Sequence, residues 1–142
     1  MKLRSTAFEG NGSIPKKYSC KGDDINPDLR WDDIPPHTKS LALSLKDPDA
    51  PNGTFVHWLV YDIDKDLVEV EENSIPGKQV ENSFGKENYG GPCPPSGEHR
   101  YYFRVFALDT ESLGDIRSMD EFDKKVAEHT IEKAEVMGKF AA

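Results

Sequence analysis

Hydrophobic residues alternate with small or polar ones in three short stretches before residue 110, which is typical of β-strands. In residues 41–45 three leucines at alternate positions share one face. Residues 55–61 are apolar on both faces apart from His57, as expected of a central strand that is covered on both sides. Residues 101–108 also have two apolar faces. If this last strand begins as early as His99, one side of it carries His99, Tyr101, Phe103 and Val105.

Strict alternation makes a specific prediction for the strand that contains His57. It places His57 on the face of Phe55, Leu59 and Tyr61, opposite the face formed by Val56, Trp58 and Val60.

The last quarter of the chain changes to a helical period. Ser118 has the character of a helix N-cap, and Glu121 stands at capping-box spacing from it. Gly138 is a C-terminal stop signal. We therefore predict a mainly β fold with one or two C-terminal helices, whose apolar positions are Met119, Phe122, Val126, Ile131, Ala134 and Met137.

Length and charge narrow the class of protein. A chain of 142 residues predicts one domain over residues 1–142. Its net charge of −8 argues against nucleic-acid binding and against general attraction to anionic membranes. No apolar run approaches the roughly 18 residues of a membrane span. Residues 1–6 lack the apolar stretch of a secretory signal, so we expect a cytoplasmic protein.

Two cysteines, Cys20 and Cys93, leave two alternatives open. They form no CxxC pair, and two thiols alone cannot build a structural zinc site. Free thiols are the default in the cytosol. The alternative is a Cys20–Cys93 disulfide, because intracellular proteins of hyperthermophiles do contain disulfides.

Three segments carry candidate chemistry, and each also has a purely structural interpretation. Residues 47–51, Asp-Pro-Asp-Ala-Pro, form a stiff turn with two carboxylates, or simply a polar turn. His57 is a ligand group or a satisfied core histidine. In residues 89–101 two glycines allow close backbone approach, and His99 and Tyr101 follow on one face. Imidazole and phenol groups beside a glycine-rich rim can hold an oxyanion, although the segment could also be a structural proline-rich loop.

Signatures of catalysis are missing from the chain. There is no G-x-S-x-G elbow, P-loop or G-x-G-x-x-G motif. The spacing of His57 and His99 with Asp47 or Asp49 matches no metal motif, and no base is evident beside Ser96. We therefore predict a protein that is not an enzyme and that has no metal and no cofactor.

The order of these segments resembles the phosphatidylethanolamine-binding protein family, in particular its prokaryotic, Raf kinase inhibitor-like branch. The resemblance runs from about Ser5 to Leu108, and residues 134–140 resemble the family's terminal helix. The motifs that carry it are residues 18–22, 25–27, 29–31, 47–51, 57–58, 89–95 and 97–101.

The resemblance implies a large antiparallel sheet packed on a smaller one, with C-terminal helices and an anion pocket at one end of the sheet. It also implies a cis peptide bond between Ala50 and Pro51. Phe55 stands at one of two positions before the pocket histidine that are both aromatic in many prokaryotic relatives. The implied walls are Asp47, His57, Gly91, Pro92, His99 and Tyr101, and the implied rim is Asp49, Pro51 and Phe55.

The leading functional hypothesis is a non-enzymatic binding module for small phosphate-like anions or phospholipid head groups, with a regulatory role. Affinity should then fall as pH rises through the titration of the pocket histidines. One alternative is a protease or kinase inhibitor that acts through a protein surface. Another is a cryptic hydrolase that uses His57, His99 and Asp47. The resemblance further implies a homodimer.

Overall fold

The computed structural model describes residues 1–142 as two antiparallel sheets and one α-helix. The larger sheet has the strand order β6-β4-β3-β7-β8, with β6 at Lys78–Gln79, β4 at Phe55–Ile63, β3 at Ser40–Asp47, β7 at Glu98–Leu108 and β8 at Thr130–Ala141. The smaller sheet has the order β1-β2-β5, with β1 at Lys2–Arg4, β2 at Leu29–Asp32 and β5 at Glu69–Val70. A short 3-10 helix, η1, spans Lys16–Tyr18. The predicted mainly β architecture is confirmed.

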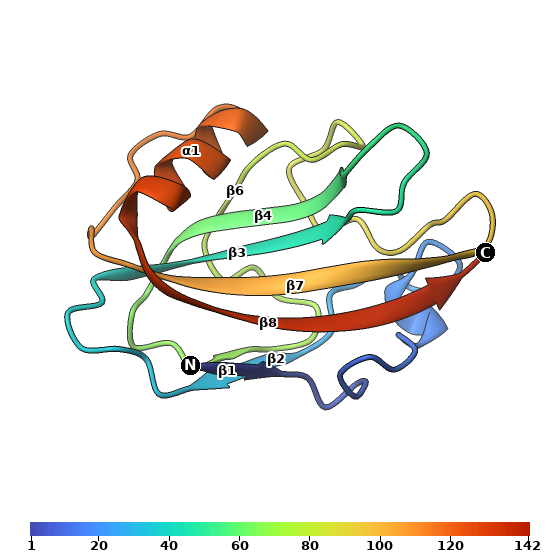
Figure 1. The fold of residues 1–142 in the computed structure, drawn as a ribbon, viewed down its shortest axis with the longest axis horizontal. Helices are drawn as coiled ribbons and strands as arrows, with labels where there is room; N and C mark the ends of the chain where they lie inside the picture. Colours follow the sequence, from blue (N-terminus) through green and yellow to red (C-terminus); the bar gives the residue numbers. More distant parts are fainter.

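The larger sheet is covered on both faces, as Figure 1 shows. On one face the leucines of β3 pack against Leu3, Leu29 and Trp31 of the smaller sheet. On the other face Ala42 and Leu108 pack against Phe122 and Val126 of α1, which spans Met119–His129. β3 therefore lies between two apolar layers, which accounts for its nearly continuous burial.

A β-bulge interrupts β4 at His57. Leu45 of β3 lies opposite Trp58, but the next residue, Lys46, lies opposite Val56, so His57 is an extra residue in β4. Consequently Trp58 joins the core between the sheets, whereas Val56 joins the α1 side together with Leu59 and Tyr61. The alternation predicted from the sequence is wrong here, because it placed Val56 with Trp58 and His57 with Leu59.

The helix α1 begins where the sequence predicts. The Ser118 hydroxyl accepts a hydrogen bond from the Glu121 N–H at 3.1 Å, and the Glu121 carboxylate accepts one from the Arg117 N–H at 3.0 Å. Acidic side chains in the first turn and His129 in the last complement the helix dipole. No helix in the structure has the length and apolar character needed to cross a bilayer.

The helix ends at His129, and the prediction of helical structure for residues 131–138 is wrong. Residues 130–141 form β8, which pairs with β7 along nearly its whole length. Ala134 and Val136 face the core with a period of two, and Gly138 lies opposite Tyr101. A Cβ at Gly138 would lie 2.5 Å from Ile14 Cγ1, so this glycine permits close packing and is no helix stop. Without residues 130–141, β7 would be an edge strand with unpaired backbone N–H and C=O groups. These groups need hydrogen-bond partners, so the segment pairs with β7 as a strand.

Removing the helix cap tests this account of α1. Ser118→Ala should lower the free energy of unfolding by about 0.5–2 kcal/mol, because the Glu121 N–H loses its acceptor. Ser118→Thr, which keeps a hydroxyl, is the control and should retain most of the stability. Urea unfolding followed by circular dichroism measures both, and equal stability of wild type and Ser118→Ala contradicts the cap.

Candidate functional site

The candidate site lies at the end of the large sheet where β3 finishes. Because β3 is antiparallel to both neighbours, its last residue lies beside the first residues of β4 and β7. This is the right-hand end of the sheet in Figure 1. A cavity of about 380 Å³ opens there, lined by Asp47, Ala50, Pro51, Asn52, Gly53, Thr54, Phe55, His57, Phe84, Cys93, Pro94, Pro95, His99 and Tyr101.

Asp47 and His99 form a buried pair in this cavity. The His99 Nδ1 lies 2.6 Å from Asp47 Oδ2, and the two residues are only 7% and 3% exposed. A carboxylate only accepts hydrogen bonds, so the Nδ1–H of His99 is the donor. The other carboxylate oxygen of Asp47 accepts the Asp49 N–H at 2.8 Å. This arrangement leaves Nε2 as the free ring nitrogen of His99, and a protonated His99 forms an ion pair with Asp47.

His57 is held by the loop of residues 82–90. Its Nδ1 lies 2.7 Å from the Gly90 carbonyl oxygen, so Nδ1–H is the donor and Nε2 is free of protein partners. The His57 carbonyl accepts hydrogen bonds from the Gly90 N–H and from the Asn82 side-chain amide. Burial lowers the pKa of His57, an effect that the Gly90 carbonyl and the Asp47 carboxylate only partly oppose.

The Tyr101 hydroxyl is buried and makes no well-formed hydrogen bond, with the Asp47 carboxylate and the Cys93 backbone as its polar neighbours. The ring lies 5.3 Å from the His57 ring, edge to face, and 6.5 Å from the His99 ring. Burial, reinforced by the Asp47 carboxylate, raises the pKa of Tyr101 well above its usual value. Tyr101 is therefore a neutral phenol with an unused donor.

The mouth of the cavity is largely apolar. Phe55 and Phe84 pack edge to face with their centroids 4.7 Å apart, beside Pro51, Pro94 and Pro95. Phe84 was not predicted from the sequence. The signal for it is indirect: the buried Asn82 holds the turn by accepting the N–H groups of Phe84 and Lys86.

Asp49 does not line the cavity but fastens its rim. Its carboxylate accepts hydrogen bonds from the Arg100 guanidinium at 2.7 and 2.9 Å and from the Arg100 backbone N–H at 2.9 Å. These contacts hold the pKa of Asp49 at about 2. The Ala50–Pro51 bond is trans, so the predicted cis bond is wrong. Asp47 instead faces the cavity because it is the last residue of β3 and shares the face of Leu43 and Leu45.

Gly91 and Pro92 also lie outside the cavity lining. The Gly91 N–H donates to Asp24 at 2.8 Å, and a Cβ at this position would lie 2.1 Å from the Tyr18 carbonyl oxygen. The Pro92 carbonyl accepts the Cys20 N–H at 3.1 Å. Both residues seat the loop before β7 against the segment that follows η1, and this close contact explains the glycine.

A family model described as Phosphatidylethanolamine-binding protein matches residues 4–141. The chain belongs to this family. The UPF0098 protein of Aquifex aeolicus is 50% identical over 122 residues, which cover 80% of this chain and 71% of that protein. The crystal structure of a phosphatidylethanolamine-binding protein homolog from Chlamydia trachomatis is 38% identical, with a TM-score of 0.93 and coverage of 99% and 97% of the two chains. YbcL of E. coli, described as a member of the mammalian family, is 27% identical, with a TM-score of 0.92 and coverage of 99% and 98%.

This family member carries a disulfide between Cys20 and Cys93, with a Cα–Cα distance of 5.5 Å. Of the two alternatives left open by the sequence, the default of free thiols is therefore wrong. Close packing of the two loops through Gly91 and Pro92 brings the sulfurs together. Both cysteines are exposed, and Cys93 also lines the cavity.

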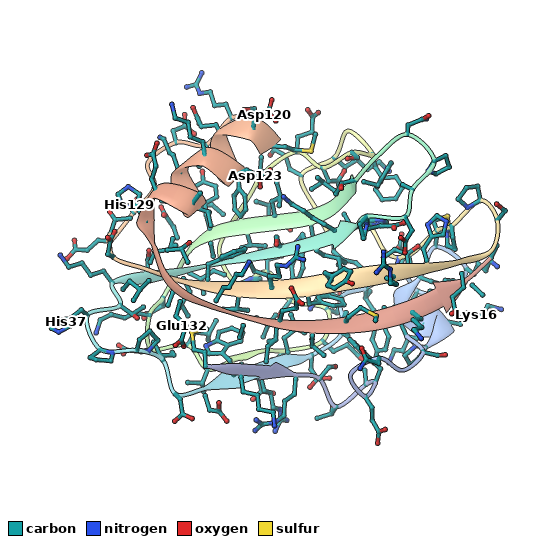
Figure 2. The ribbon with its side chains drawn as sticks, in the orientation of Figure 1. Lys16, His37, Asp120, Asp123, His129 and Glu132 are labelled. Atoms are coloured by element: carbon teal, nitrogen blue, oxygen red, sulfur yellow. A yellow bond between two sulfur atoms is a disulfide. The ribbon has the colours of Figure 1, made fainter.

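The remaining histidines of this family member lie elsewhere. Figure 2 shows His37 and His129 at the end of the sheet opposite Lys16, away from the terminus of β3. His129 is paired with Asp109 at 2.7 Å. No group of three or more His, Cys, Asp or Glu side chains is arranged to hold a metal ion. In the cavity only Asp47 and His99 meet directly, and His57 is bound to a carbonyl group.

Removal of the disulfide should destabilise the protein. The bond closes a separation of 73 residues, so its loss in the double variant Cys20→Ser, Cys93→Ser should lower the free energy of unfolding by about 2–5 kcal/mol. Denaturant unfolding measures the effect. Intact mass after alkylation, with and without reductant, establishes the bond itself. Alkylation of both cysteines in the native, unreduced protein contradicts the pairing.

The buried state of His57 predicts a pH dependence of stability. Because the folded-state pKa lies below the unfolded value of about 6.5, the unfolded chain binds a proton that the folded chain excludes. Stability from this source is complete above about pH 6.5 and declines as pH falls toward the folded-state pKa, with a slope of up to about 1.4 kcal/mol per pH unit.

The variant His57→Gln lacks this titration, so the difference in unfolding free energy between wild type and variant should shrink as the solution is acidified. His37→Gln, at the opposite end of the sheet, is the matched control. A constant difference from about pH 5 to 8 contradicts the burial argument.

Proposed function

We propose that this protein is a non-enzymatic binding module for small phosphate-like anions, including phosphorylated head groups. The observation that carries the proposal is the Tyr101 hydroxyl, which is buried beside the cavity without a well-formed hydrogen bond. A buried polar group without a partner costs free energy, and an oxygen atom of a bound anion would satisfy it. The free Nε2 atoms of His57 and His99 belong to the same cavity.

The charged groups around the cavity favour the binding of an anion, although the net charge of the protein is −8. The Asp47 carboxylate, the one acidic group on the lining, is already engaged by His99 and by the Asp49 N–H. Asp49 is neutralised by Arg100. A protonated His99 keeps Nε2–H as a donor for the ligand, and donors in a site with little water bind an anion more strongly than donors in solvent.

The apolar mouth favours a ligand that carries a small organic group on its anion. Phe55, Phe84 and the prolines would contact that group, while the anionic end reaches the polar floor. The family name describes proteins that bind phosphatidylethanolamine, which agrees with this division of the cavity. We therefore choose phosphoethanolamine, the polar head of that lipid, as the first probe.

Calorimetric titration with phosphoethanolamine tests the site. Tyr101→Phe should weaken binding by about 0.5–3 kcal/mol, because only the donor hydroxyl is lost. Tyr102→Phe is the matched control, since Tyr102 lies on the other face of β7; its hydroxyl accepts only one bond from Arg100, at 3.3 Å, and Arg100 keeps its three hydrogen bonds to Asp49 without it. Equal losses in the two variants would show that Tyr101 does not contact the anion.

His99→Ala should also weaken binding, because the variant lacks the free Nε2 of His99 in the cavity. Recovery of unaltered phosphoethanolamine after long incubation is expected for a binding module. Release of inorganic phosphate that His99→Ala abolishes would instead support a hydrolase.

A further inference from the structure

The disulfide between Cys20 and Cys93 forms part of the cavity wall. Cys93 lines the cavity together with the two residues that follow it, Pro94 and Pro95. Its backbone also lies beside the Tyr101 hydroxyl, the donor on which the proposed anion binding depends. Cys20 lies outside the cavity lining, in the turn directly after η1. The bond therefore joins one wall of the cavity to a different part of the fold.

Hydrogen bonds hold the loop before β7 only on either side of this wall. The Pro92 carbonyl accepts the Cys20 N–H at 3.1 Å. The Gly97 carbonyl accepts the Ala142 N–H at 2.8 Å. Between these two points, residues 93–96 make no well-formed hydrogen bond, and two of them are prolines without an N–H to donate. The disulfide fastens this stretch to the rest of the fold, and no well-formed hydrogen bond duplicates it.

Both cysteines are exposed, so a dithiol in solution can reach the bond. Exposed disulfides are reduced more readily than buried structural ones. In the first exchange step, a thiolate of the dithiol attacks one protein sulfur, forms a mixed disulfide and releases the other cysteine, which takes up a proton. In the second step, the remaining thiol of the dithiol loses its proton and displaces the bound cysteine, which becomes protonated. The products are two protein thiols and one oxidised dithiol.

The contacts that precede the wall do not involve sulfur and remain after reduction. The Gly91 N–H donates to the Asp24 carboxylate at 2.8 Å, and the Tyr89 hydroxyl donates to the Tyr18 carbonyl at 2.7 Å. Residues 93–96, in contrast, gain conformational freedom when the disulfide opens. A ligand that contacts this wall must then order it on binding, and this entropic cost lowers the affinity.

Building on the proposed function, we infer that the Cys20–Cys93 disulfide is a redox switch of the anion cavity. The oxidised protein binds a phosphate-like anion more tightly than the protein in which a dithiol has reduced the bond. The coupling between the two reactions is reciprocal, as it is for any pair of linked equilibria. A bound anion therefore makes the disulfide harder to reduce, by the same factor by which oxidation raises the affinity.

Calorimetric titration with phosphoethanolamine compares the oxidised protein with the protein reduced by dithiothreitol, a dithiol that carries no charge near neutral pH and does not compete for an anion site. The reduced protein should bind about three- to tenfold more weakly. Circular dichroism establishes that it is still folded. The double variant Cys20→Ser, Cys93→Ser is the matched control. It should bind with the affinity of the reduced wild type, whether or not dithiothreitol is present.

Redox titration of the wild type gives a second measurement that needs no variant. The disulfide is equilibrated with dithiothreitol at known ratios of its reduced and oxidised forms, with and without saturating phosphoethanolamine. The ligand should lower the reduction potential by about 14–30 mV, which is the three- to tenfold factor converted at about 30 mV per factor of ten.

The outcomes separate the switch from the proposed function. Equal or tighter binding by the reduced protein overturns the switch and leaves anion binding intact, and so does a reduction potential that the ligand does not change. Unfolding of the reduced protein also overturns the switch, because the bond would then be a requirement for folding. Absence of phosphoethanolamine binding by the oxidised protein overturns the proposed function itself.

Discussion

The antiparallel pairing of β3 with both of its neighbours determines where the candidate binding cavity lies in this protein. β3 is buried on both faces, so it can lie only at the centre of a covered sheet. Antiparallel neighbours then bring the end of β3 beside the starts of β4 and β7. Asp47, His57 and His99 are 10 or more residues apart in the chain, yet they line one cavity for this reason.

The bulge at His57 decides what that cavity contains. Without the extra residue, the alternation of β4 would place the His57 side chain on the α1 side together with Leu59. The bulge turns His57 toward Tyr101, and Gly90 and Asn82 hold it there. Bulges commonly redirect a side chain near a functional site. Here the cost of interrupting the ladder is offset in part by the hydrogen bonds of the loop of residues 82–90.

Three contacts that hold the loops at this end of the sheet complete the site. The Arg100–Asp49 pair fastens the turn after β3 to β7. The disulfide and the Gly91–Asp24 hydrogen bond fasten the loop before β7 to residues 20–24. Because the walls are fixed by hydrogen bonds and a covalent bond, the polar floor is already organised, and a ligand of the proposed kind would have less conformational entropy to overcome on binding. Gly91 and Pro92, which the family resemblance implied as pocket walls, instead hold the loop before β7 in place.

The sequence by itself determined the covered strands and the start of α1. Both depend on local information: period-two burial in residues 41–45 and the spacing of Ser118 and Glu121. The resemblance of its motifs to a known family, together with their places at strand ends, indicated Asp47, His99 and Tyr101 for the candidate site. Only the tertiary structure decided that residues 130–141 form a strand, because apolar positions in that segment fit both periods and the open edge of β7 supplied the backbone partners. The bulge at His57 and the Cys20–Cys93 bond were also settled by packing between distant segments, which no local pattern records.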